Sequence, residues 1–254
     1  MHIKVIGQGP NLVMLHGWSM HSAVWHDLAE GLEKNFTLHL VDLPGHGQSN
    51  WQEGDLELDT LINNLAKLLP EPAYWLGWSL GGLISLAFAD KYPEKVRKLV
   101  LMAATPCFVK AENWTSAMDA VIFQTFANNL EDNQAETLQR FLLLQARGSE
   151  HSRQTIRQLG EQLAIEKPPI AAALTAGLDL LINTDMRKQL SVLQCPVKMI
   201  LGERDTLIPQ DMLLAASELQ THLQTTLLTG AGHAPFIAQP SECQHEIEQF
   251  LNDK

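Results

Sequence analysis

The stretch that decides the fold runs from Tyr74 to Gly82 and reads Tyr-Trp-Leu-Gly-Trp-Ser-Leu-Gly-Gly. Its first four residues form an apolar run typical of a buried strand, and helical spacing follows through Leu83 and Leu86. The pattern Gly-x-Ser-x-Gly therefore lies between a strand and a helix, which predicts a nucleophile elbow at Ser79. Such a turn holds the serine in a strained conformation, and glycines leave room for the neighbouring backbone.

The rest of the chain repeats the alternation of strand and helix, which predicts an α/β fold with a largely parallel sheet. Strands are expected at 3–6, 12–15, 37–41, 74–77, 99–102, 197–201 and 225–228. A helix is expected over 58–69, with its leucines on one face. The last helix is expected to begin at Ser241, with Gln244 completing a capping box. It would bury Cys243, Ile247, Phe250 and Leu251.

The middle of the chain breaks this rhythm, since residues 110–185 contain apolar spacing of helical period and no strand pattern. We expect an inserted helical cap there, between a first core segment at 1–109 and a second at 186–254. One cap helix is expected to carry Met118, Val121, Ile122 and Phe126 on its apolar face, and a second Leu138, Phe141, Leu142 and Gln145. The longest would follow Lys167–Pro168–Pro169 and span 170–182.

Length, charge and cysteine content narrow the class of protein. The chain has 254 residues, 45% of them apolar, which is enough to bury a core without disulfides or metals. A net charge of −11 disfavours partners such as nucleic acid or anionic membranes. No apolar run approaches the roughly 20 residues of a membrane span, and no signal peptide precedes the first strand. Three cysteines without a CxxC pair are typical of reduced thiols, so we expect a cytoplasmic protein. We also expect a monomer.

Two further residues fit the partners that a nucleophilic serine needs. His233 follows the strand at 225–228 through a glycine-rich loop, and Asp205 follows the strand at 197–201. Both would lie at the carboxyl ends of parallel strands, where open α/β sheets place their active sites. The chain order Ser79, Asp205, His233 therefore predicts a catalytic triad. The alternative is a helix-capping aspartate and an unrelated loop histidine.

The residues after the second expected strand, His16–Gly17–Trp18, fit an oxyanion hole. We expect the backbone N–H groups of Trp18 and Leu80 to be its two donors. His16 is interpreted as a residue that holds this loop by hydrogen bonds. Asp42 and His46 are interpreted as residues that shape the Gly/Pro turn at 42–49.

These motifs together resemble the α/β-hydrolase superfamily over the whole chain. The resemblance rests on 16–18, 42–49, 77–82, 202–205 and 230–236 in this order. Four segments are also similar to one family within it, the pimeloyl-[acyl-carrier protein] methyl ester esterases of biotin synthesis. They are Trp75–Gly82, Thr105–Phe108, Arg140–Leu142 and His233–Phe236.

The resemblance implies a substrate, the methyl ester of a pimeloyl chain held on acyl carrier protein. We expect no metal or cofactor, because the sequence has no HExxH motif, no paired cysteines and no GxxxxGK loop. It implies that the substrate site is lined by Trp18, Leu80, Phe141, Leu142, Leu143, Leu144 and Gln145, and Trp18, Trp78, Phe141 and Leu142 would enclose the methylene chain. It also implies that Arg140, Arg153 and Arg157 contact the carrier and its phosphopantetheine phosphate. Glu136 stands where the family has another arginine, which departs from its pattern.

The local charge agrees with such a partner. Residues 140–160 include four arginines and one glutamate, which gives this segment a local charge of about +3 in an acidic chain. The alternative is an ordinary solvated helix face. For the activity, three alternatives stay open: a general short-chain carboxylesterase, a non-catalytic ligand-binding protein and a C–C bond hydrolase. A dehalogenase is disfavoured because its elbow would carry an aspartate instead of Ser79.

Overall fold

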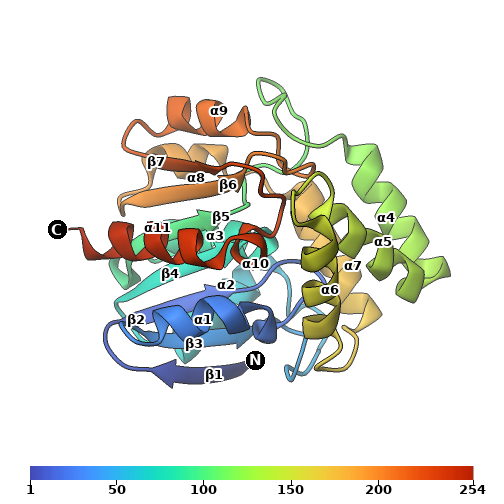
Figure 1. Ribbon diagram of the computed structural model, residues 1–254, viewed down its shortest axis with the longest axis horizontal. Coiled ribbons are helices and arrows are strands. Elements are labelled where there is room, and N and C mark those ends of the chain that lie inside the picture. Colours follow the sequence, from blue (N-terminus) through green and yellow to red (C-terminus); the bar gives the residue numbers. More distant parts are fainter. Residues whose placement is uncertain (254) are drawn as a thin grey trace.

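A central sheet organises the molecule, for which the computed structural model describes residues 1–253 (Figure 1). Its strand order is β1-β3-β2-β4-β5-β6-β7. Only β1 is antiparallel to its neighbour, and the other pairs are parallel. The strands are β1 (His2–Gly7), β2 (Asn11–Leu15), β3 (Thr37–Asp42), β4 (Ala73–Trp78), β5 (Val96–Met102), β6 (Val197–Gly202) and β7 (Gln224–Leu228).

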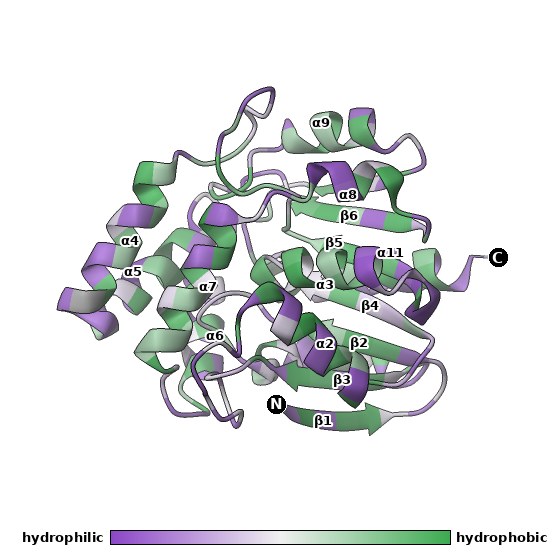
Figure 2. Ribbon diagram, turned by 180° about the vertical axis from the view of Figure 1, so that it is seen from behind, coloured by the Kyte–Doolittle hydropathy of each residue, from purple (hydrophilic) through white to green (hydrophobic). Residues whose placement is uncertain are grey.

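Helices cover both faces of this sheet, with α1 and α11 on one side and α2, α3 and α8 on the other (Figures 1 and 2). The helices of the core are η1 (Ser22–Trp25), α1 (His26–Leu32), α2 (Leu58–Leu68), α3 (Leu80–Lys91), η2 (Pro93–Lys95), α8 (Arg187–Val192), α9 (Met212–Leu219), α10 (Pro235–Ala238) and α11 (Pro240–Asn252). The inner strands β2 and β4 and the helix α3 are almost completely buried, as expected for a parallel sheet covered on both faces. Each of the seven expected strands lies within an observed one, and the predicted α/β fold with a largely parallel sheet is confirmed.

Four helices between β5 and α8 pack together at the end of the sheet to which the parallel strands point (Figure 1). They are α4 (Ala120–Asp132), α5 (Gln134–Ala146), α6 (Ser152–Leu163) and α7 (Ala171–Asn183). We call this group the cap. The helix expected at 170–182 corresponds to α7, which begins directly after Pro168, Pro169 and Ile170. Helix α7 contacts both α4 and α3, so it joins the cap to the core.

Two details of the expected helices are wrong. In α4, Val121 and Ile122 are exposed, and the buried face carries Phe123 and Leu130 instead. The apolar spacing from Met118 misled because Met118 precedes the helix, where it pairs with the loop at Val109. Helix α11 begins at Pro240 with Gln239 as its N-cap and no side-chain cap bond, so no capping box forms.

Within the described residues, no helix is both long and apolar enough to cross a bilayer.

Candidate active site

The turn between β4 and α3 holds Ser79 in a conformation that few residues adopt. Its backbone dihedrals are φ 52° and ψ −116°, and its N–H donates to the carbonyl of Met102 at 3.0 Å. A Cβ atom at Gly77 would overlap the backbone of Gly81, and one at Gly81 would overlap the backbone of Leu15. The glycines are therefore required by the close approach of three backbone segments, as the sequence predicted. Positive φ at a non-glycine residue is strained and is typical of functional sites.

The loops after β6 and β7 approach each other just as closely, which brings the predicted acid and base together. A Cβ atom at Gly202 would overlap the backbone of Ala231 and Gly232. The N–H of Arg204 donates to the carbonyl of Ala231 at 2.8 Å. Gly202 allows this contact because it has no side chain. In the sequence, a glycine at the end of an apolar run could have indicated such a close approach.

The three side chains form one hydrogen-bonded chain. His233 Nε2 lies 3.0 Å from Ser79 Oγ, and His233 Nδ1 lies 2.8 Å from Asp205 Oδ2. The second oxygen of Asp205 accepts the backbone N–H groups of Leu207 and Ile208 at 2.8 and 3.0 Å. Because both carboxylate oxygens are occupied as acceptors, His233 must donate from Nδ1, which leaves Nε2 free to accept the serine proton. All three side chains are buried.

The two segments that carry the expected oxyanion donors pack against each other. Leu80 is the first residue of α3, so its N–H has no acceptor within the helix. The beginning of α3 packs against the backbone of Leu15 and His16, directly before Trp18 in the chain. His16 holds this loop as expected: its Nδ1 donates to the carbonyl of Gly17 at 2.8 Å, and its Nε2 accepts the N–H of Leu43 at 3.0 Å.

The turn at 42–49 has the structural role predicted for it. The carboxylate of Asp42 accepts the N–H groups of Ser22 and Gln48 at 2.7 and 3.0 Å. His46 Nδ1 donates to the carbonyl of Pro44 at 2.9 Å. Burial lowers the pKa of His46 to about 4 and, with the neighbouring His46, that of His16 to about 3, so both rings are neutral near pH 7.

Two cap helices, α5 and α7, contact residues of the site. The indole of Trp18 donates to the carbonyl of Leu174 in α7 at 2.8 Å and packs edge-on against Phe141 in α5, with ring centroids 4.6 Å apart. Gln145 accepts the backbone N–H of His233 at 3.0 Å with its carbonyl oxygen. Its side chain is buried, and neither amide atom has a hydrogen-bond partner among the described residues. An unpaired buried amide beside a triad is well suited to bind polar atoms of a substrate.

Three of the expected substrate residues lie elsewhere or act differently. Leu143 is 47% exposed, and with Leu144 it borders a surface cavity between α5 and α6, so the structure does not bring these two to the triad. Trp78 donates from its indole to the carbonyl of His233 at 2.8 Å, and its ring packs edge-on against Trp25 and Phe236. Trp78 therefore holds the loop that carries His233, a role that its place in the elbow motif did not reveal.

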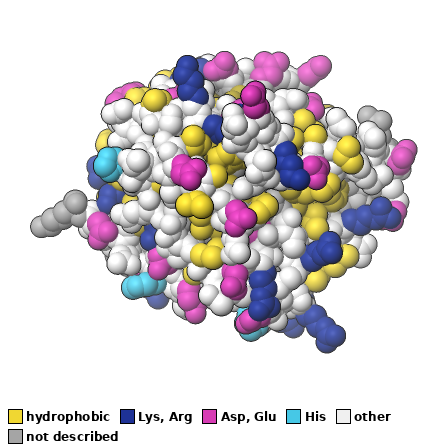
Figure 3. Space-filling model, turned by 90° about the horizontal axis from the view of Figure 1, so that it is seen from above, with side chains coloured by type: hydrophobic (Ala, Val, Ile, Leu, Met, Phe, Trp, Pro, Cys, Tyr) yellow, Lys and Arg dark blue, Asp and Glu magenta, His cyan; other side chains and the backbone are white. Residues whose placement is uncertain are grey.

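The cap arginines are exposed, but their charges are partly neutralised. Arg140 pairs with Glu136 at 2.6 Å, one turn away on α5, and Arg157 approaches Glu161 at 3.8 Å. The expected local charge of +3 omitted both acids, Glu136 and Glu161, because they lie just outside the segment that was counted. Figure 3 shows basic side chains beside apolar surface at the cap end of the molecule. Within the described chain, Arg147 and Arg153 form no ion pair.

Comparison with known proteins decides the family. Residues 10–240 match the family described as alpha/beta hydrolase fold. The chain belongs to the alpha/beta hydrolase fold family. Within this family it is 44% identical over 253 residues to the pimeloyl-[acyl-carrier protein] methyl ester esterase of Xylella fastidiosa (strain M12), covering 99% of this chain and 98% of the relative. The protein of the same name from Xanthomonas oryzae pv. oryzae (strain MAFF 311018) is 43% identical over 251 residues, with the same coverage.

Solved structures of alpha/beta hydrolases share the fold at much lower sequence identity. An esterase from Exiguobacterium antarcticum superposes with a TM-score of 0.89 at 19% identity, covering 99% of this chain and 95% of that one. A bromoperoxidase from Bacillus anthracis reaches a TM-score of 0.88 at 20% identity, with the same coverage. These two titles name different activities, so the shared fold alone does not select a reaction.

Proposed function

We propose that this chain is a serine carboxylic ester hydrolase that cleaves the methyl ester of pimeloyl-acyl carrier protein, releasing methanol, in biotin synthesis. The observation that carries the proposal is the linked Ser79, His233 and Asp205 in a chain 44% identical, over its full length, to esterases of that name. All three side chains come from one chain, which supports a monomer as the active unit. Its three cysteines are free, which supports action in the reducing cytoplasm.

In the proposed mechanism, Ser79 Oγ attacks the ester carbonyl while His233 Nε2 takes its proton, and Asp205 stabilises the imidazolium. The N–H groups of Trp18 and Leu80 would hold the oxyanion, each typically contributing about 3–4 kcal/mol. His233 then gives this proton to the departing methoxide oxygen, which leaves as methanol. A water molecule, deprotonated by the same ring, releases the acid and restores the serine.

The buried apolar groups of the cap would hold the methylene chain. Phe141 and Leu142 are buried in α5 and Trp18 joins them, so a flexible acyl chain would lie in a dry environment. The two amide atoms of Gln145 would bind a polar atom of the ester or the attacking water.

Carrier docking is proposed for the outer face of the cap, at Arg140, Arg153 and Arg157. Guanidinium groups suit both the carboxylates of an acidic carrier and a phosphodiester. The ion pair between Glu136 and Arg140 would weaken this docking, because the carrier must compete with an acid that is already in place.

The proposal is tested by comparing kcat/KM for pimeloyl-carrier methyl ester and for a free short-chain methyl ester. The carrier-linked ester should be preferred. Reversing the three arginines to glutamate should lower kcat/KM for the carrier form by about tenfold or more and leave the free ester unchanged, since rim charges act on association. Arg97→Glu, an exposed arginine in β5, is the matched control. Equal losses for both substrates would favour the alternative, a general carboxylesterase.

A further inference from the structure

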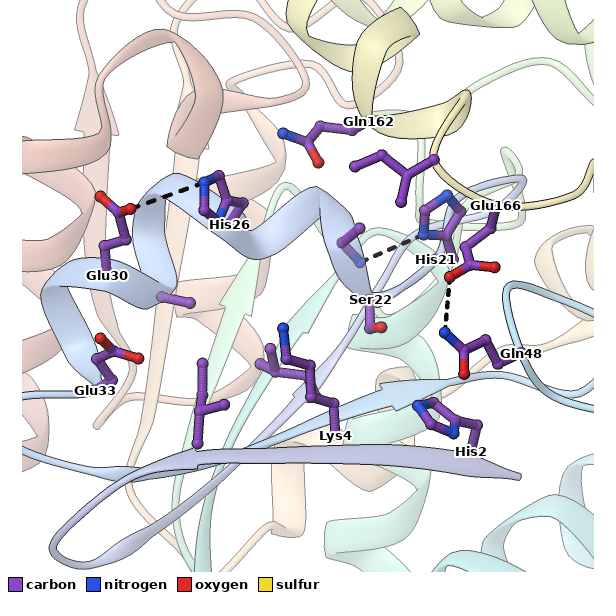
Figure 4. Close-up of a pocket in the computed structure, with 15 residues that line it drawn as sticks. His2, Lys4, His21, Ser22, His26, Glu30, Glu33, Gln48, Gln162 and Glu166 are labelled. Atoms are coloured by element: carbon purple, nitrogen blue, oxygen red, sulfur yellow. Dashed lines mark hydrogen bonds and ion pairs between the residues drawn. The ribbon is translucent and has the colours of Figure 1, made fainter.

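A cavity that is separate from the triad lies between the cap and the core (Figure 4). Its volume is about 490 Å³, within the range of sites for small molecules. One wall is formed by β1 and η1–α1 of the core, and the other by the end of α6 and the residues after it. None of the three triad residues lines it.

Two buried polar atoms at this cavity lack partners, one on each wall. His21 is only 2% exposed, and its Nδ1 accepts the backbone N–H of Ala23 at 3.4 Å. A neutral ring in this position carries its proton on Nε2, and that donor has no acceptor among the described residues. On the cap side, Oε1 of Gln162 is a buried acceptor without a donor. Leaving a buried polar group without a hydrogen bond is costly, so an unpaired donor and an unpaired acceptor among the residues of one cavity point to a ligand.

Charges of both signs surround the same space. Lys4 and His2 rise from β1 toward Ser22 and His21 (Figure 4). Glu166 lies on the cap side, where its Oε1 accepts from Gln48 at 2.8 Å. Two further titratable lining residues, His26 and Glu30, lie on α1, and Glu33 directly follows this helix. The apolar lining comes from small or branched side chains, which are Ile6, Ala29, Leu40 and Ile165.

We propose that this cavity is a binding site for a small zwitterion of the amino-acid class. The carboxylate would accept from His21 Nε2 and the Lys4 ammonium, and the ligand's ammonium would donate to Gln162 Oε1 and Glu166. A simple carboxylate leaves Gln162 without a donor and places its charge beside glutamates. A simple amine leaves His21 without an acceptor. A ligand with both groups satisfies the two walls at once and also matches the charges of Lys4 and Glu166.

Such a ligand would link the cap to the loop of the active site. His21 lies three residues after Trp18, in the same loop. Gln162 belongs to α6, which packs against η1 and α10. Occupancy would therefore hold α6 against the core, and backbone amides of 152–163 should exchange more slowly with deuterium when the ligand is bound.

The experiment is a binding screen of the whole protein by saturation-transfer NMR, with the twenty L-amino acids, propionate and propylamine at millimolar concentration. At least one amino acid should bind saturably, while propionate and propylamine should bind at least about tenfold more weakly. Lys4→Gln and Gln162→Leu should each raise Kd by about tenfold, the loss expected for a hydrogen bond to a charged group. Lys188→Gln, an exposed lysine on α8, should leave Kd unchanged.

Four results would overturn the proposal. The first is that no amino acid binds, which would mean that water alone fills the cavity. The second is equal binding of propionate, and the third is a Kd unaffected by Lys4→Gln, whose exposed side chain can be replaced without loss of the fold. The fourth is an unchanged exchange rate in α6 with ligand bound. Ser79→Ala should bind the amino acid as the wild type does, so this test is independent of the proposed esterase activity.

Discussion

Replacing Asp205 with asparagine tests the geometry of the triad without changing its volume. One carboxylate oxygen accepts two backbone N–H groups, from Leu207 and Ile208, and the other accepts from His233. In Asp205→Asn, the amide oxygen is expected to keep the two backbone donors, because turning it would place N–H against N–H. The amide nitrogen then faces His233 Nδ1 and donates to it.

The histidine is thereby forced into the wrong tautomer, with its proton on Nε2, where it can no longer accept from Ser79. We expect kcat to fall about 10⁴-fold, which corresponds to about 5 kcal/mol of transition-state stabilisation. The assay is hydrolysis of a p-nitrophenyl ester, with unfolding in urea as a check on stability. Asp211→Asn, an exposed aspartate before α9, is the control and should keep full activity. A kcat within tenfold of wild type for Asp205→Asn would refute the assignment of roles.

Two further predictions concern stability. The pKa values of His16 and His46 in the folded protein, about 3 and 4, lie below the value near 6.5 in the unfolded chain. Protonation therefore favours the unfolded chain, so the contribution of these two residues to stability is complete above pH 6.5 and is lost as the pH falls toward 4. The free energy of unfolding in urea should fall by at least about 2 kcal/mol between pH 7 and pH 5, and an unchanged value would contradict the burial argument. Gly177→Ala would place a Cβ atom 2.8 Å from Cδ1 of Trp18 and should destabilise by about 1–3 kcal/mol, whereas Gly160→Ala, on α6 with its nearest atom at 3.9 Å, should be neutral or stabilising by up to about 1 kcal/mol. Equal thermal stability of the two variants would contradict the close packing of α7 on the indole.

The parts of the fold that depend on local pattern could be predicted from the sequence. The strands are short runs of apolar residues between polar turns, and this local pattern does not depend on where a strand lies in the sheet. The elbow could be predicted because its glycines are sterically required and lie within a motif of five residues. Asp205 and His233 could be placed because both follow such strands, and parallel strands end at one edge.

What could not be predicted depends on contacts between distant segments. Val121 and Ile122 were expected inside α4, but which face is buried depends on where α5 and α7 lie. Leu143 was assigned with its neighbours in one run, although successive residues of a helix point in different directions. The role of Trp78 required the position of His233, which is 155 residues away.

The unpaired amide of Gln145 is another feature that only the structure reveals. Its spacing in α5 is that of any core position, and a glutamine there is unremarkable in the sequence. Burial without a partner beside the carbonyl that holds His233 is what marks it. Side chains of this kind are found when each buried polar atom is assigned its hydrogen bonds.

The central claim, that Ser79 hydrolyses the methyl ester of the carrier-linked chain, is tested most directly by intact mass spectrometry of pimeloyl-carrier methyl ester after incubation. With the wild-type protein the carrier should lose the mass of one methylene group, the difference between methyl ester and acid, and keep its acyl thioester. With Ser79→Ala the carrier should stay unchanged over the same time. Loss of the whole acyl chain, or the same conversion by Ser79→Ala, would contradict the account.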